Sequence, residues 1–143
     1  MEINSERVVT PYPVSIIMDN FSDINNLSRL IQNNQSQLSD INAADHIQEI
    51  IIIENRIKIT TDQGLIFIDL IKTEPDKITY KLNVNNLKNF NEMFIIFNAD
   101  TQSNTLWLTI NVDIPYVMGL MLKPKIKNFM DEINKRLSEN VTF

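Results

Sequence analysis

Apolar and polar residues alternate with a period of two through most of the region between residues 47 and 114, which is the pattern of half-buried β-strands. Turn-forming residues, among them Gly64 and Pro75, divide this region into short runs. Because the connections are short, we expect the strands to pair as antiparallel neighbours rather than through helical crossovers. The predicted strands comprise residues 47–54, 56–61, 65–73, 77–84, 92–99 and 105–114.

The segment before this region predicts one strand and two short helices. Residues 3–10 read as a strand that ends at the Pro11-Tyr12-Pro13 run, because proline cannot donate to a sheet ladder. Apolar residues at three- and four-residue spacings predict a helix over residues 14–20. A second helix should begin at Ser22 or Asp23 as its N-cap and continue through Ile31, before a polar loop over residues 37–46.

After Pro115 the period becomes helical. We expect a long C-terminal helix, bent or divided at Pro124, whose apolar stripe packs on the sheet. The stripe comprises Ile126, Phe129, Met130, Ile133 and Leu137, and Val117, Met118, Met121 and Leu122 extend it upstream.

Strand register predicts which side chains face the interior. In the last hairpin, residues whose numbers sum to 203 should pair, which sets Phe97 opposite Leu106 and Ile95 opposite Leu108 on the inner face. The same register leaves an outer apolar patch of Phe94, Ile96 and Trp107, which predicts a homodimer contact unless the N-terminal segment buries it. In the preceding hairpin Ile68 should pair with Leu82 and Leu70 with Tyr80. Asp69 would then point outward, towards Arg56 and Lys58.

Length and composition bound the kind of protein. A chain of 143 residues fits a single domain over residues 1–143, and 43% hydrophobic residues suffice for a core. The absence of cysteine excludes disulfides, thiolate metal sites and a cysteine nucleophile, and a single histidine, His46, argues against a metal site. We therefore expect no metal and no cofactor.

Charge and hydropathy indicate where the chain acts. A net charge of −5 argues against nucleic-acid binding. The N-terminus resembles no signal peptide and no apolar run reaches about 20 residues, so we expect a cytoplasmic protein. The C-terminal helix is basic and amphipathic, but the sheet needs its apolar stripe, so we expect no stable membrane insertion.

The order of strand, two short helices, six antiparallel strands and long helix resembles the helix-grip fold of the START-like superfamily, also called SRPBCC or polyketide cyclase/dehydrase-like, in its small bacterial members. The stretches that carry the resemblance are RVVTPYPV at 7–14, FSDINNL at 21–27, EPDK at 74–77, INVDIP at 110–115 and MGLMLKP at 118–124. The resemblance implies an α+β fold, with a curved sheet of six to seven strands around the C-terminal helix. It also implies a hydrophobic tunnel between sheet and helix for lipid-like or polycyclic molecules.

The inner face is accordingly either a packed core or a cavity for an apolar ligand. The predicted ligand-binding residues are Tyr80, Leu82, Ile95, Phe97, Leu108, Met118, Met121 and Phe129. Tyr80 would supply a hydrogen-bond donor, and the flexible methionines would adapt to the ligand. Residues 85–91 and 116–122 would form the entrance.

Three functions remain open. The first is a non-catalytic binder or carrier of a hydrophobic small molecule. The second is an enzyme of the cyclase or dehydratase type, which needs an ionisable group in the cavity, either Tyr80 or an inward-facing Asp69. The third is a protein-interaction module with a packed interior that uses the outer patch.

Overall fold

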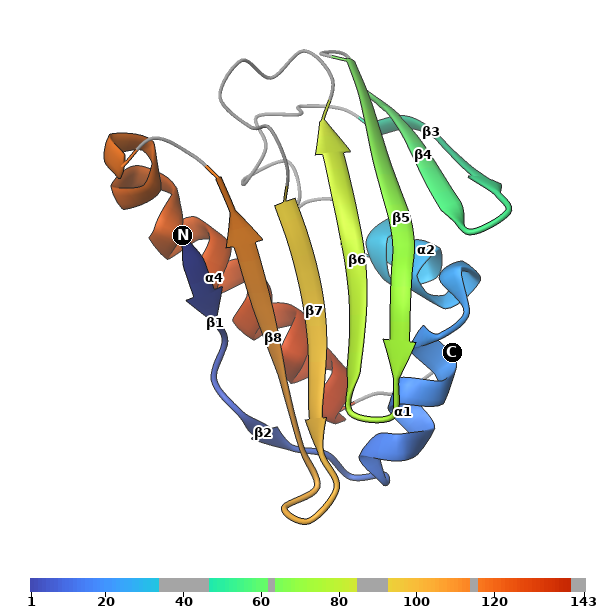
Figure 1. The fold of residues 1–143 in the computed structure, drawn as a ribbon, viewed down its shortest axis with the longest axis vertical. Coiled ribbons are helices and arrows are strands. Elements are labelled where there is room, and N and C mark those ends of the chain that lie inside the picture. The colour runs from blue at the N-terminus through green and yellow to red at the C-terminus, as the bar shows by residue number, and fades with distance from the viewer. Residues whose placement is uncertain (34–46, 62–63, 85–92, 114–115, 140–143) are drawn as a thin grey trace.

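The strands of the described residues form one antiparallel sheet. The computed structural model describes residues 1–33, 47–61, 64–84, 93–113 and 116–139. Within these ranges the strand order is β1-β8-β7-β6-β5-β4-β3, and β2 pairs with β8 beside β1 (Figure 1). The strands are β1 Glu2–Asn4, β2 Val8–Val9, β3 Ile47–Ile53, β4 Arg56–Thr61, β5 Gly64–Glu74, β6 Lys77–Val84, β7 Met93–Asp100 and β8 Thr105–Val112. The predicted α+β fold with an antiparallel sheet is confirmed, and each predicted strand between 47 and 114 is present with its ends moved by at most two residues.

The predicted first strand is divided into two. Both β1 and β2 pair with β8, and Ser5 lies between them. The amide of Ser5 donates to the carbonyl of Leu108 at 2.8 Å, while Ser5 Oγ accepts from the amide of Leu108 at 2.8 Å. Ser5 Oγ thus takes the place of a backbone carbonyl as the acceptor for Leu108, and this replacement interrupts the pairing with β8 between β1 and β2.

The β5–β6 register agrees with the sequence prediction. Ile68 pairs with Leu82 and Leu70 with Tyr80, so these side chains share the inner face. The Pro75-Asp76 turn connects Glu74 to Lys77, and an irregularity at Ile71 adjusts the ladder. The predicted pairing assumed a three-residue turn, but the turn has two residues, and the irregularity at Ile71 supplies the shift of one residue that restores the predicted register.

The predicted β7–β8 register is wrong by two residues. Phe97 pairs with Leu108 and Ile95 with Ile110, because the loop between Asp100 and Thr105 is four residues long. Asn104 closes that loop with φ of 52°, a left-handed conformation that asparagine tolerates. A slip of two residues leaves every side chain on its predicted face, so the assignment of the inner face survives.

The two short helices follow β2. Helix α1 spans Val14–Phe21, and Asn104 Oδ1 accepts the amide of Val14 at 2.9 Å. Helix α2 spans Ile24–Asn33, and Asp23 Oδ1 accepts the amide of Asn25 at 2.9 Å, as expected of an N-cap. Asn104 therefore ties the β7–β8 loop to the start of α1.

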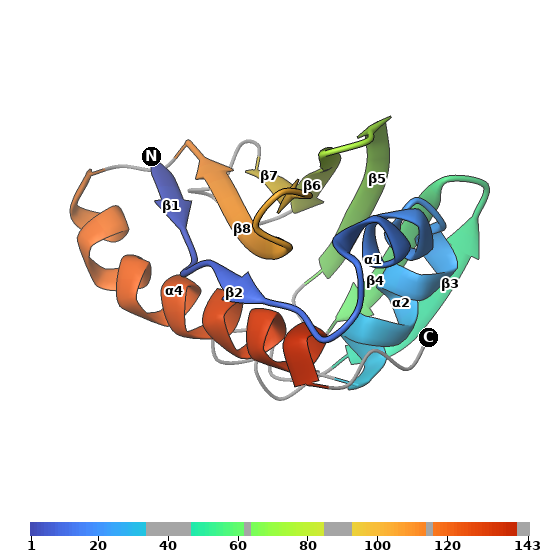
Figure 2. The ribbon, with the colours of Figure 1, turned by 90° about the horizontal axis from the view of Figure 1, so that it is seen from below.

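The long helix α4, Tyr116–Glu139, continues through Pro124 as one element. It packs against β1, β2 and β8, while α1 lies against β6 and β7 and α2 against β3 and β4. The sheet curves around the helices, which all lie on one side of it (Figure 2). The core consequently forms between this concave face and the helices. Its α4 members are Ile126, Met130 and Ile133.

Candidate ligand-binding site

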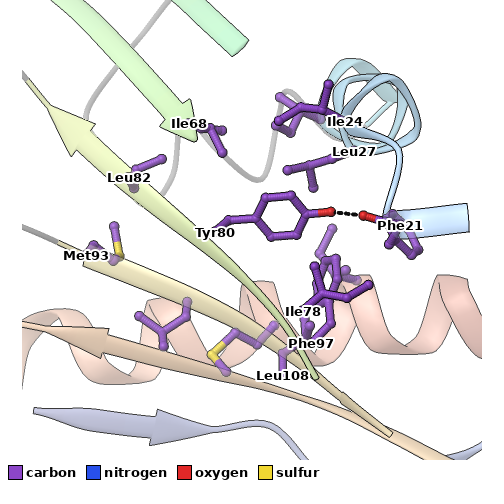
Figure 3. Close-up of a cluster of buried hydrophobic side chains, with 14 of the residues drawn as sticks. Phe21, Ile24, Leu27, Ile68, Ile78, Tyr80, Leu82, Met93, Phe97 and Leu108 are labelled. Carbon is purple, nitrogen blue, oxygen red and sulfur yellow. Dashed lines mark hydrogen bonds between the residues drawn. The ribbon is translucent and has the colours of Figure 1, made fainter. Parts of the chain in front are cut away.

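The concave face of the sheet is a continuous apolar surface. Tyr80, Leu82, Phe97 and Leu108 all point to this face and are buried, as the sequence predicts (Figure 3). Cross-strand pairing places Leu82 beside Met93 and Phe97 beside both Ile78 and Leu108. The predicted site residues of the sheet therefore belong to one cluster.

Tyr80 has a hydrogen-bond partner within the protein. Its hydroxyl donates to the backbone carbonyl of Phe21, the last residue of α1 (Figure 3). The ring of Phe97 contacts the side-chain rings of Phe21 and Tyr80 edge-on, with centroid distances of 4.8 Å to Phe21 and 5.6 Å to Tyr80. Burial, with a smaller contribution from the charge of Asp23, raises the pKa of Tyr80 above its ordinary value. The expectation that Tyr80 offers a donor to a ligand is thus wrong, because its one hydroxyl hydrogen is already donated to the carbonyl of Phe21.

Ile95 is one of the core-packed apolar residues that are only partly buried, together with Val8, Ile50 and Leu70. It lies on the concave face between its ladder partners Tyr80 and Ile110, both of which are buried. Ile95 itself is only half-buried although it belongs to a central strand. An inward-facing side chain keeps accessible surface only where its neighbours leave space beside it. The concave face is therefore not closed over Ile95.

The predicted helix residues do not all join the sheet residues. Met121 has 72% of its surface exposed, so its expected place in the interior is wrong. The side chains of Met118 and Phe129, like the predicted entrance at residues 85–91, lie outside the described part of the structure. The described α4 side chains that do reach the core are Ile126, Met130 and Ile133, all within the predicted stripe.

Asp69 points away from the interior, as predicted. Its carboxylate forms a two-point ion pair with Arg56, at 2.6 Å from Nε and 3.1 Å from Nη2. The hydrogen bond to Asp69 raises the pKa of the Arg56 guanidinium, which keeps it charged. Among the described residues no Asp, Glu, Lys, Arg or His is buried. The described interior thus offers Tyr80 as its one titratable side chain, and burial keeps this phenol protonated.

Asn134 is a buried polar residue that the sequence analysis did not select. It is 1% exposed, and its Nδ2 donates to Ser5 Oγ at 3.0 Å and to the carbonyl of Glu6 at 2.6 Å. These bonds fasten α4 to the link between β1 and β2. Asn134 Oδ1 is buried and has no partner among the described residues. Its spacing of four residues from the buried Met130 was the sequence signal that could have revealed it.

The outer face of the sheet carries a polar groove of about 570 Å³ instead of an apolar patch. The groove includes Trp107 and Ile96, but the Arg7 guanidinium covers the Trp107 ring at 3.8 Å from its centroid. Thr109 Oγ1 donates to Asn4 Oδ1 at 2.6 Å and accepts from Asn98 Nδ2 at 3.0 Å. The predicted patch of Phe94, Ile96 and Trp107 is therefore half-buried and mixed with polar groups, and the homodimer through it stays a prediction.

Two further properties of the described residues concern metal ions and membranes. Nowhere in those ranges do three potential metal-ligating side chains come together. Across the same ranges, each helix is too short or too polar to cross a lipid bilayer.

The curved antiparallel sheet, the two short helices between its first strands and β3, and the long C-terminal helix define the helix-grip fold of START-like (SRPBCC) proteins. An uncharacterised protein of Bacillus thuringiensis shares this fold with a TM-score of 0.62 and 12% sequence identity, over 96% of each chain. A START superfamily protein of Mycobacterium smegmatis and the Aha1 dimer of Colwellia psychrerythraea each give a TM-score of 0.55 at 13% identity, over 99% of each chain. At such low identities the likeness shows the fold alone. Neither a protein-family model nor a curated protein sequence matches the chain.

Proposed function

We propose that the protein binds or carries a hydrophobic small molecule, lipid-like or polycyclic, between the concave face of the sheet and α4, without catalysis. The observation that carries the proposal is the half-buried Ile95 between its two buried ladder partners, Tyr80 and Ile110. A ligand that covered Ile95 would bury apolar surface on both partners, worth about 25 cal/mol per Å² removed from water. Ligand binding is typical of proteins with this fold, which supports the same reading.

The residues available for contact on the described sheet are Ile95 and its apolar neighbours. Leu82, Met93 and Ile110 surround it on three strands, and each offers only aliphatic or thioether groups. Such a surface selects for shape and apolar area rather than for particular polar groups. Met118 and Phe129 remain predicted contacts from the helix.

The enzyme alternative receives less support from the same geometry. An acid or base must reach the ligand with a titratable group. Asp69 faces outward and is paired with Arg56, and the Tyr80 hydroxyl donates its hydrogen bond to the carbonyl of Phe21. A binding role accounts for this apolar surface without a proton-transfer step.

The test is a binding titration with the neutral apolar dye N-phenyl-1-naphthylamine. The wild-type protein should enhance its fluorescence saturably, and a C12 alcohol or fatty acid should displace it. Ile95→Trp should weaken dye binding at least about tenfold, because the larger ring fills the space beside residue 95. The matched control is Ile96→Trp on the outer face of the same strand, which should leave dye affinity unchanged.

Equal dye affinities for the wild type, Ile95→Trp and Ile96→Trp would contradict the proposed site. Failure of the wild type to bind the dye or any competitor, with a folded protein by circular dichroism, would contradict the proposed function itself. Ile95→Phe provides a milder substitution if the tryptophan variant does not fold.

A further inference from the structure

The first half of α4 exposes apolar side chains to solvent. Val117, Leu120 and Met121 are 69%, 59% and 72% exposed. Their spacing of three and four residues places them together on one side of the helix. We name these three residues the α4 apolar patch.

The α4 apolar patch lies opposite the side of the helix that the fold uses. Gly119, Ile126 and Met130 are buried. At about 100° per residue, the direction of these buried residues differs from that of the patch by roughly half a turn. The helix is therefore apolar on two opposite sides, and the sheet needs only one. The expectation that the sheet occupies the apolar surface of the C-terminal helix therefore does not apply to its exposed side.

Lysines border the α4 apolar patch on both sides. Lys125 lies on one side of it in the helical projection, and Lys123 and Lys127 lie on the other. All three are exposed, and residues 116–130 contain no Asp or Glu. An apolar strip between lysines is the arrangement in which a helix lies on a negatively charged lipid surface. The apolar side chains then enter the headgroup boundary and the ammonium groups meet phosphates.

We propose that the solvent-facing side of α4, through the α4 apolar patch and Lys123, Lys125 and Lys127, docks reversibly on an anionic lipid surface. A second copy of the chain fits this side of the helix less well, because a symmetric contact would bring the lysines of the two copies together. No part of α4 needs to cross the bilayer, and the docking does not depend on whether the interior holds a ligand.

The experiment is flotation of the full chain with two kinds of vesicle, one of phosphatidylcholine alone and one of equal parts phosphatidylcholine and phosphatidylglycerol. The wild type should bind the anionic vesicles, and binding should fall as salt rises. The double variant Leu120→Ser/Met121→Ser should bind at least about tenfold more weakly. Its melting temperature should stay close to that of the wild type, because both side chains are exposed.

The matched control is the double variant Ile53→Ser/Ile71→Ser, which removes apolar side chains of 54% and 53% exposure from the sheet. It should bind anionic vesicles like the wild type. The triple variant Lys123→Gln/Lys125→Gln/Lys127→Gln should bind weakly and lose most of the salt dependence. That result would show that these three lysines, and not the overall charge of the protein, cause the salt-dependent binding.

Three results would overturn the proposal. The first is no binding of the wild type to anionic vesicles, and the second is equal binding to both kinds of vesicle. The third is a wild-type dimer in sedimentation that Leu120→Ser/Met121→Ser converts to a monomer, since a second copy would then cover the patch.

Discussion

The hydroxyl of Tyr80 reaches from the middle of β6 to the backbone carbonyl of Phe21, where α1 ends (Figure 3). The last carbonyls of a helix have no partner within it, and one that is buried must find a partner elsewhere. Tyr80 therefore connects the sheet to the end of a helix across the core. This contact uses the one titratable side chain of the described interior for structure.

Tyr80→Phe should destabilise the protein by about 1–3 kcal/mol, because the Phe21 carbonyl would lose this partner in an apolar environment. Urea unfolding measures the difference. Tyr12→Phe is the control, since Tyr12 is exposed and its loss of a hydroxyl should change stability by less than about 0.5 kcal/mol. Equal effects of the two substitutions would contradict the structural role of Tyr80.

The raised pKa of Tyr80 predicts a loss of stability at high pH. In the unfolded chain the phenol titrates near pH 10, whereas in the folded protein it holds its proton to higher pH. The stabilisation is therefore complete below about pH 10 and decreases above it, by at most about 1.4 kcal/mol per pH unit for one proton. Urea unfolding between about pH 8 and about pH 11 should show a steeper decline for the wild type than for Tyr80→Phe. Parallel declines would show that Tyr80 titrates alike in both states.

Asn134→Ala should destabilise the protein by about 1–3 kcal/mol, because it removes the donors that hold Ser5 and Glu6 against α4. Asn128→Ala is the matched control on an exposed position of the same helix, and its effect should stay within about 0.5 kcal/mol. Thermal or urea unfolding distinguishes the two. Asn134→Asp should be worse than Asn134→Ala at neutral pH, since it places a carboxylate among buried acceptors.

The pair of Arg56 and Asp69 should contribute little to stability and nothing to ligand binding. Half of the Arg56 side chain is exposed, so a double-mutant cycle with Arg56→Gln and Asp69→Asn should give a coupling energy no larger than the error of the unfolding measurement. The same variants should bind N-phenyl-1-naphthylamine like the wild type. A marked loss of dye affinity in Asp69→Asn would show that this carboxylate reaches the ligand and would favour the enzyme alternative.

Alternation predicted the faces of the strands better than their pairing. The inward face of Ile95 follows from the period of two. Its partner is Ile110 instead of the predicted Leu108, and this slip of two residues leaves the side chain on the same face. The pairing itself depended on how the loop ending at Asn104 closes, and Asn104 acts through bonds to Val14 and Thr10, far away in the sequence. The sequence around Asn104 does not indicate these distant partners.

The site residues on the sheet could be predicted from the sequence more reliably than those on α4. Tyr80 and Phe97 lie in strands whose apolar residues alternate with polar ones. Only one face of these strands is apolar, so only that face can be buried in the core. The start of α4 has apolar residues on several sides, so the helical period does not decide whether Met121 faces the sheet or the solvent. The partner of Tyr80 is a backbone carbonyl, which carries no sequence signal.

The most direct test of the central claim is methyl NMR of protein labelled at the isoleucine δ1 positions, titrated with 1-dodecanol. A molecule bound between the sheet and α4 should shift the Ile95 resonance and that of its neighbour Ile110. It should leave unchanged the resonances of Ile96 on the outer face and of the exposed Ile71 in β5. Shifts confined to exposed isoleucines, or no shifts at all at saturating alcohol, would contradict a ligand site beside Ile95.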